Sequence, residues 1–162
     1  MRIGVISDTH GLREQARAAV ELMGTVDMLL HAGDFFDDAI YLSNLFSFPV
    51  VGVRGNCDFA GPREQLIEAD EVKILLIHGH QYGVKSSLQS LTYYAREREA
   101  NVAIFGHTHQ PEIQWVDDLL LFNPGSATRP RGVNSYPTFG VFSLDNRVIT
   151  PSIVELKDQI SL

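Results

Sequence analysis

The chain of 162 residues is long enough for one domain with a hydrophobic core, and its 44% hydrophobic content argues against disorder. The formal net charge of −7, without a basic cluster, does not favour general nucleic-acid binding. No apolar run reaches the ~18 residues that span a bilayer, and a single Cys excludes an internal disulfide. We therefore expect one cytoplasmic domain over 1–162 that does not enter a membrane.

The first half of the chain alternates short apolar runs with helical patterns. The predicted elements are, in order, a strand over Ile3–Ile6, a helix over 12–23 that ends at Gly24, a strand over Met28–His31, a helix capped by Asp37 or Asp38, and a strand from Pro49. The second helix is expected to bury Ile40, Leu42, Leu45 and Phe46. This β-α-β-α-β order implies a parallel sheet with right-handed crossovers.

The second half changes to hairpin patterns. Three pairs of strand-like runs flank short acidic or Asn-containing turns, namely 65–69 with 72–77, 112–116 with 119–122, and 138–144 with 147–155. A helix capped by Ser86 or Ser87 runs to about Glu99, and Val102–Phe105 predicts another buried strand. Trp115 and Phe122 are expected to fill the hairpin core. The pattern indicates one α/β domain whose hairpins form a second sheet or extend the first.

Polar residues stand where the predicted strands end. Asp8 and His10 follow the first run, and residues two apart in an extended chain point the same way. Ligands of parallel sheets bind beyond the carboxyl ends of the strands. Packing alone gives no reason to place groups that are costly to desolvate at all of these ends, beside Gly. The residues expected to converge are Asp8, His10, Asp34, Asn56, His78, His107 and His109.

Each of these residues also has an ordinary structural explanation when taken alone. Asp34 is a typical helix cap, Asn56 a typical turn residue, and His78 a typical buried histidine. The complete set favours metal binding, because its oxygen and nitrogen ligands suit Mn, Fe, Ni or Zn rather than Ca or an iron–sulfur cluster. Seven ligands suit two metal ions about 3.5–4 Å apart that share a carboxylate, and Asp34 is the predicted bridge.

In order and type, the motifs resemble those of the calcineurin-like metallophosphoesterases, whose signature reads D-x-H, G-D, G-N-H-[DE], a lone His and G-H-x-H. The matching residues are Asp8-Thr9-His10, Gly33-Asp34, Gly55-Asn56-Cys57-Asp58, His78 and Gly106-His107-Thr108-His109. The short length, Cys57 and the loop Asn123-Pro124-Gly125-Ser126 are similar to the small bacterial and archaeal phosphodiesterase branch, whose fold a retromer subunit shares. The resemblance implies a four-layer α/β/β/α sandwich of two mixed sheets flanked by helices.

The resemblance also implies two divalent cations, with Mn²⁺ favoured over Fe, Ni or Zn, and a small phosphate-ester substrate. One ion would be held by Asp8, His10, Asp34 and His109, and the other by Asp34, Asn56, His78 and His107. A water or hydroxide that bridges the ions would attack phosphorus in line, with Asn56 and His107 as catalytic residues. Self-association as a homodimer is a further expectation of the resemblance.

The position of Cys57 departs from the family pattern. The larger family has a His there, which protonates or stabilises the leaving oxygen, and a thiol does not replace a near-neutral imidazole as a general acid. We therefore expect diesters or activated esters to be preferred over alkyl monoesters, unless Cys57 is only a small packing residue. The expected substrate contacts are Cys57, His80, Arg129 and Arg131, with solvated loop positions as the alternative for the arginines. His31 is expected to have a structural role or to support a metal ligand, rather than to bind a metal directly.

Two other functions are weighed against hydrolysis of a phosphate ester. The first is an interaction module on the same fold, which lost metal ligands would favour, yet all the motif positions keep their ligands here. The second is zinc-dependent amide hydrolysis, which would place the His-x-His on the first strand and gives Asn56 no role. The sequence does not name the substrate, because cyclic nucleotides, nucleotide-derived diesters and other small phosphodiesters all fit.

Overall fold

The computed structural model describes residues 1–133 and 135–157, so residues 134 and 158–162 of the predicted domain lie outside the described residues. Within them the chain forms strands, three α-helices and a short 3₁₀ helix. The strands are β1 (Arg2–Ile6), β2 (Met28–His31), β3 (Val50–Gly52), β4 (Glu64–Ala69), β5 (Val72–Ile77), β6 (Val102–Ile104), β7 (Pro111–Val116), β8 (Leu119–Pro124), β9 (Thr138–Asp145) and β10 (Val148–Glu155). The helices are α1 (Arg13–Met23), α2 (Phe36–Leu45), η1 (His80–Tyr82) and α3 (Gln89–Glu97).

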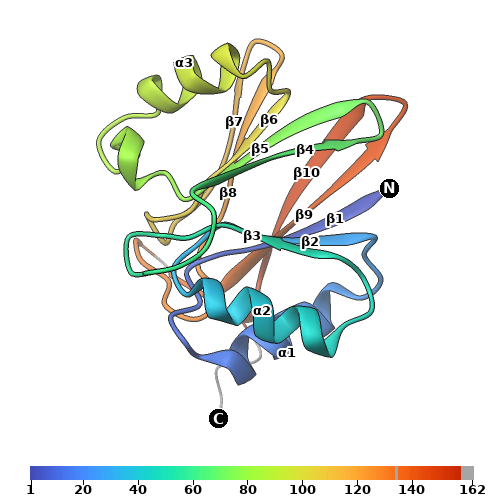
Figure 1. Ribbon diagram of the computed structural model, residues 1–162, viewed down its shortest axis with the longest axis vertical. Coiled ribbons are helices and arrows are strands. Elements are labelled where there is room, and N and C mark those ends of the chain that lie inside the picture. Colours follow the sequence, from blue (N-terminus) through green and yellow to red (C-terminus); the bar gives the residue numbers. More distant parts are fainter. Residues whose placement is uncertain (134, 158–162) are drawn as a thin grey trace.

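Two five-stranded mixed sheets stack between the helices in the described residues. The first sheet has the order β10-β9-β1-β2-β3 and the second the order β4-β5-β6-β8-β7. Figure 1 shows α1 and α2 on the outer face of the first sheet and α3 on the outer face of the second. The four-layer α/β/β/α sandwich is thereby confirmed.

Three apolar clusters hold the four layers together. The central cluster lies between the sheets and joins buried residues of both, including Val5, Leu30, Ile74 and Phe122. The other two clusters pack α1 and α2 on the first sheet and α3 on the second. In α1 the buried residues Ala16, Ala19, Val20 and Met23 fall on one helical stripe, which is why this segment forms an amphipathic helix. No helix in the described residues is long and apolar enough to cross a membrane.

Strand register brings the carboxyl ends of the central strands to one edge of the molecule. In the first sheet Ile6 pairs with His31, and His31 pairs with Gly52. In the second sheet Leu76 pairs with Ile104. All these pairings are parallel, so the loops that follow β1, β2, β3, β5 and β6 leave the sheets at the same edge. The predicted polar residues lie in or next to these loops.

The predicted order of elements is confirmed, including all three hairpins, while several details are wrong. Neither Asp37 nor Asp38 caps α2, because the N-cap position is Phe35 and no side-chain cap bond is formed there. Ile40 and Leu45 are 47% and 46% exposed, since only the stripe around Leu42 faces the sheet. The N-cap position of α3 is Leu88, although Ser87 Oγ accepts the backbone N–H of Gln89 at 3.1 Å. The helix ends at Glu97 rather than Glu99.

The last hairpin shows how a sequence pattern leaves sheet membership open. The β9–β10 pair returns to the first sheet, where β9 runs antiparallel to β1, instead of joining the second. Phe122 is fully buried as expected. Trp115, expected in the hairpin core, is 46% exposed because β7 is an edge strand.

The tight contact between the two sheets gives a prediction about stability. Gly140 in β9 faces Phe122 in β8, and a Cβ at position 140 would overlap ring atoms of Phe122. We expect Gly140→Ala to lower the free energy of unfolding by about 1–3 kcal/mol, the usual cost of overpacking a core. Ser143→Ala, at an exposed position of the same strand, should change it by less than about 0.5 kcal/mol. Urea unfolding measures both, and equal effects would contradict this account of the sheet contact.

Candidate metal centre

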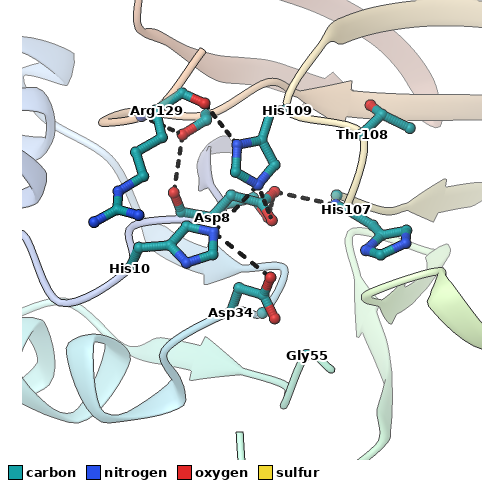
Figure 2. Close-up of polar contacts among 12 residues, drawn as sticks. Asp8, His10, Asp34, Gly55, His107, Thr108, His109 and Arg129 are labelled. Carbon is teal, nitrogen blue, oxygen red and sulfur yellow. Dashed lines mark hydrogen bonds and ion pairs between the residues drawn. The ribbon is translucent and has the colours of Figure 1, made fainter. Parts of the chain in front are cut away.

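Four side chains meet at the shared edge of the two sheets. The ligand atoms of Asp8, His10, Asp34 and His109 all lie within 4.8 Å of one another. The Nε2 atom of His109 is 3.3 Å from Asp8 Oδ1 and 3.2 Å from His10 Nε2, and His10 Nε2 is 3.6 Å from Asp34 Oδ2. Figure 2 shows the four side chains turned toward one another, Asp8 and His10 from the loop after β1, Asp34 from the loop after β2, and His109 from the loop after β6. Two carboxylates and two imidazoles therefore converge.

His78 extends this cluster on the side of Asp34. Its Nε2 atom lies 3.0 Å from Asn56 Oδ1, 3.4 Å from Asp34 Oδ1 and 3.9 Å from Asp8 Oδ1. The ring is fully buried, whereas Asn56 is exposed. The two oxygens of Asp34 thus face different imidazoles, Oδ1 toward His78 and Oδ2 toward His10.

Backbone carbonyl groups fix the orientation of two of the imidazoles. His78 Nδ1 lies 2.8 Å from Ala32 O, and His109 Nδ1 lies 2.6 Å from Arg129 O. A carbonyl oxygen accepts only, so Nδ1 carries the proton and donates in both rings. The Nε2 atoms of both rings are thereby aimed at the carboxylates, the arrangement that metal-binding histidines use.

His107 and His80 border the cluster at a greater distance. The ring centroid of His107 is 5.1 Å from that of His78, and that of His80 is 5.4 Å from His78 and 6.0 Å from His107. His107 donates its backbone N–H to Asp8 Oδ2 at 3.1 Å. The Nδ1 atom of His80 is buried without a hydrogen-bond partner in the described residues.

The remaining predicted residues lie in loops around the cluster. Cys57 is exposed and donates its backbone N–H to Asp34 Oδ1 at 3.1 Å. Arg129 and Arg131 are both exposed, and each contacts His109 through its backbone, Arg129 by its carbonyl and Arg131 by its N–H at 3.1 Å. No ion pair of either guanidinium with a carboxylate is present among the described residues. Figure 2 shows the Arg129 side chain beside His10, at the rim of the cluster.

Left-handed backbone recurs among the residues of the cluster. Asp8, His10, Asp34, His107 and His109 all have positive φ angles, between 50° and 71°. Such left-handed conformations are unfavourable for residues other than Gly and persist only where surrounding contacts impose them. We expected Asp8 and His10 to point the same way in an extended chain, and this reason is wrong. Their side chains converge because both residues adopt the left-handed conformation in a turn.

Glycines allow the loops to press directly on the carboxylates. A Cβ at Gly55 would overlap Asp34 Oδ1, and a Cβ at Gly106 would overlap Ser7 Oγ. Ser7 in turn donates its hydroxyl to Asp8 Oδ2 at 2.7 Å. The Gly in each motif is thus required by close approach, because any larger residue would displace a carboxylate or its hydrogen-bond donor.

Asp58 joins two of the loops, a role that the sequence did not reveal. Its carboxylate accepts the backbone N–H groups of Phe35, Phe36 and Gly55, at 3.1, 2.8 and 2.7 Å. A carboxylate from the loop after β3 therefore occupies the N-terminus of α2, where negative charge is favourable. This contact holds the Asn56–Cys57 segment against Asp34.

The end of β8 and the loop after it support the cluster from the other side. Ser126 Oγ donates to Asp8 O at 2.9 Å, and Thr128 Oγ1 lies 3.1 Å from the same oxygen. Asn123 Nδ2 donates to Gly106 O at 3.1 Å and to Thr108 Oγ1 at 3.0 Å. These residues hold the backbones of both histidine motifs. The resemblance pointed to the loop from Asn123 to Ser126, but the sequence did not reveal these contacts.

The protonation of the cluster follows from burial and charge. Burial lowers the pKa of His10, and burial together with His78 and Lys85 lowers the pKa of His107 to about 4. Burial also acts to lower the pKa of His78, but the hydrogen bond with Asp34 and the charges of Asp8 and Asp34 raise it overall. Burial opposes ionisation of Asp34, yet its bonds to His78 and Cys57 hold its pKa well below the usual range.

The donor set fits a divalent cation. Asp8 Oδ1 is buried without a hydrogen-bond partner in the described residues, and it lies among imidazole nitrogens. A buried carboxylate oxygen without a donor is costly unless a positive charge neutralises it. Hard oxygen and borderline nitrogen ligands suit a first-row divalent metal.

Comparison with known proteins identifies the family. Residues 1–147 match the model of the calcineurin-like phosphoesterase superfamily domain, so the chain belongs to that superfamily. It is 36% identical over 153 residues to the probable metallophosphoesterase YsnB of Bacillus subtilis, covering 93% of this chain and 88% of that protein. It is 28% identical over 178 residues to the phosphodiesterase MJ0936 of Methanocaldococcus jannaschii, covering 96% of this chain and all of that protein.

Solved structures agree with this assignment. A predicted phosphoesterase from Streptococcus pneumoniae superposes with a TM-score of 0.81 at 28% identity, covering 95% of this chain and 88% of that one. Vps29 from Chaetomium thermophilum has a TM-score of 0.76 at 22% identity, covering 98% and 88%, which shows a shared fold alone. The chain is therefore a metallophosphoesterase with phosphodiesterases among its homologues.

The loop contact made by Asp58 gives a prediction. Asp58→Ala leaves three backbone N–H groups at the start of α2 and at Gly55 without their acceptor. We expect it to lower the free energy of unfolding by about 1–3 kcal/mol. Asp37→Ala removes a charge from the same helical turn but at an exposed position, and it should cost less than about 1 kcal/mol. Thermal and urea unfolding measure both, and equal losses would show that Asp58 acts only through helix charge.

Proposed function

We propose that the chain is a phosphodiesterase that works with two divalent cations and takes small phosphodiesters as substrates. The observation that carries this proposal is the convergence of Asp8, His10, Asp34 and His109, with an unpartnered carboxylate oxygen among them. Asp34, Asn56, His78 and His107 would hold the second cation, so Asp34 would be shared. The opposite directions of the two Asp34 oxygens, toward His10 and toward His78, support the shared role.

Divalent cations held there would supply Lewis acidity and make a coordinated water more acidic, which is the chemistry that phosphate-ester hydrolysis needs. In the overall reaction the oxygen of water bonds to phosphorus, the bond from phosphorus to the leaving oxygen breaks, and a proton reaches the leaving oxygen. No side-chain nucleophile is needed. The histidines that contact carbonyl groups through Nδ1 keep the ligand atoms in place throughout.

The surroundings of Cys57 support a diester substrate. Burial, and after it the nearby Asp34, raise the pKa of the Cys57 thiol, so the group stays neutral and is a weak donor. A poor leaving group such as an alkoxide depends most on a general acid, which is typically worth ~10²–10⁴-fold in rate. We therefore assign diesters and activated esters as the preferred substrates, and alkyl monoesters as poor ones. If Cys57 is only a small packing residue, this preference will be absent.

We assign substrate contacts to His80, Arg129 and Arg131 as well as Cys57. His80 offers a buried, unpartnered Nδ1 close to His107. The exposed arginines lie in the loop after β8, and a guanidinium is a suitable hydrogen-bond donor to a phosphate oxygen.

We place the enzyme in the cytoplasm, with Mn²⁺ as the favoured ion. The net charge of −7 supports small substrates rather than nucleic acid. Assembly as a homodimer stays a prediction.

Metal content and turnover test the proposal together. Protein purified without chelator should carry close to two metal ions per chain and cleave an aryl phosphodiester faster than the matching monoester when Mn²⁺ is added. Asp34→Asn should lower diester turnover by about 10²-fold or more, the scale of losing one electrostatic stabiliser. Asp37→Asn, an exposed acid nearby, should retain turnover and serves as the control.

Each other outcome has a definite meaning. Bound metal without turnover would favour an interaction module on the same fold over an enzyme. A protein with no bound metal and no turnover would contradict the inference that the residues at the strand ends form a metal site. Alkyl monoester turnover as fast as diester turnover would contradict the role given to Cys57.

The raised pKa of His78 predicts how metal uptake depends on pH. In the metal-free protein His78 stays protonated above its ordinary pKa of 6.5, and a protonated imidazole does not bind a cation. Mn²⁺ affinity should therefore increase as the pH rises through this range, by up to about tenfold per pH unit, with proton release on binding. Calorimetric titrations in buffers of different ionisation enthalpy measure both quantities. An affinity that does not change between about pH 6 and 8 would contradict ligation by His78.

A further inference from the structure

Three fully buried polar residues connect the first metal-ligand motif to the scaffold. They are Thr9, the middle residue of the D-x-H motif, His31, the last residue of β2, and Asp38, in the first turn of α2. None of them belongs to the cluster of ligand atoms. Buried polar groups of this kind are costly unless every one is hydrogen-bonded, so their pairing specifies the local structure closely.

The hydrogen bonds of the three residues form one donor-to-acceptor chain, from His31 through Thr9 to Asp38. The backbone N–H of Gly33 donates to His31 Nδ1 at 3.2 Å, which leaves the ring proton on Nε2. His31 Nε2 lies 2.9 Å from Thr9 Oγ1 and donates to it, and Thr9 Oγ1 donates to Asp38 Oδ2 at 2.6 Å. Burial lowers the pKa of His31, which agrees with a neutral ring that both accepts and donates.

The chain of bonds ends on a charged carboxylate that also holds the end of the motif turn. Asp38 Oδ2 accepts the backbone N–H of Gly11 at 2.9 Å, and Asp38 Oδ1 pairs with Arg13 Nε at 3.3 Å. The turn that precedes Gly11 contains Asp8 and His10 in left-handed conformations. A turn with this strain needs outside contacts to persist, and Thr9 supplies them from its centre.

The two halves of the candidate metal centre differ in how firmly they are held. Asp8, His10, Asp34 and His109 already lie within 4.8 Å of one another. On the other half, His78 is buried and held by Ala32 O. Asn56, however, is exposed, and the ring of His107 makes only aromatic contacts to His78 and His80 among the described residues. A site whose ligands are preorganised binds its ion with less ordering cost.

We propose that His31, Thr9 and Asp38 are positioning residues that preorganise the Asp8–His10 turn. The half-site of Asp8, His10, Asp34 and His109 therefore binds a divalent cation more tightly than the half-site of Asn56, His78 and His107. This inference rests on the proposed two-metal function. The order in which the ions bind would then be set by His31, Thr9 and Asp38. These residues are buried and would touch neither metal nor substrate.

Titration of the metal-free full chain with Mn²⁺ by calorimetry tests the proposal. The natural protein should take up one ion tightly and a second more weakly. Thr9→Val removes the hydroxyl at nearly constant volume and should weaken the tight step by about 10–100-fold, the usual effect of losing support for a metal ligand, while leaving the weak step unchanged. Thr9→Ser keeps the hydroxyl and should restore the tight step.

A matched substitution separates positioning from general destabilisation. Thr92 in α3 is also buried, at 7% exposure, and its hydroxyl donates to Leu88 O at 2.7 Å, remote from the motif turn. Thr92→Val should lower the melting temperature of the metal-free protein but keep both binding steps. If Thr9→Val retains the tight step, or if Thr92→Val loses it equally, the proposal is wrong.

A second variant covers the case in which Thr9→Val does not fold. Asp38→Asn keeps the shape of the side chain but removes the charge on which the bonds from Thr9 and Gly11 end. It should weaken the same tight step, and an unchanged step would overturn the proposal. Failure of the two-metal function would appear differently, as a natural protein that binds no Mn²⁺ at all.

Discussion

Buried carboxylates and imidazoles crowd together at one edge of the two sheets, and the loops around them are shaped by this crowding. Asp8 and Asp34 are almost fully buried, and Asp8 Oδ1 has no donor among the described residues. Such groups are tolerated only where positive charge or hydrogen bonds compensate for lost water. The left-handed turns and the close approach of Gly55 and Gly106 all serve to bring these side chains together. Fold and chemistry are thus joined at the same loops.

Much of the fold was predictable because its elements are locally encoded. Helical spacing located α1, whose stripe of Ala16, Ala19, Val20 and Met23 is buried as expected. Alternating runs around acidic turns located the three hairpins. The convergence of the motif residues was predictable from topology, since parallel strands with helical crossovers present their carboxyl ends at one edge. A polar residue at each of several strand ends therefore carries spatial information even without a structure.

The support of the cluster was not predictable, because it depends on contacts between segments far apart in the sequence. Asp58 looked like the end of a motif, yet it accepts the N–H groups that begin α2. Asp38 looked like a helix cap, yet it is buried beneath Thr9. Ser126 belongs to a loop that the resemblance singled out, but its bond to Asp8 O was not predicted. The left-handed turn at Asp8 and His10 was also missed, since a residue pattern at a strand end does not encode φ.

Anomalous X-ray scattering from a crystal grown with Mn²⁺ would locate the ions. We expect two manganese peaks on either side of the Asp34 carboxylate, one ligated by Asp8, His10 and His109 and one by Asn56, His78 and His107. Two peaks that share Asp34 would establish the dinuclear centre. A crystal with saturating Mn²⁺ and no peak at this edge of the sheets, or with peaks that do not touch Asp34, would contradict it.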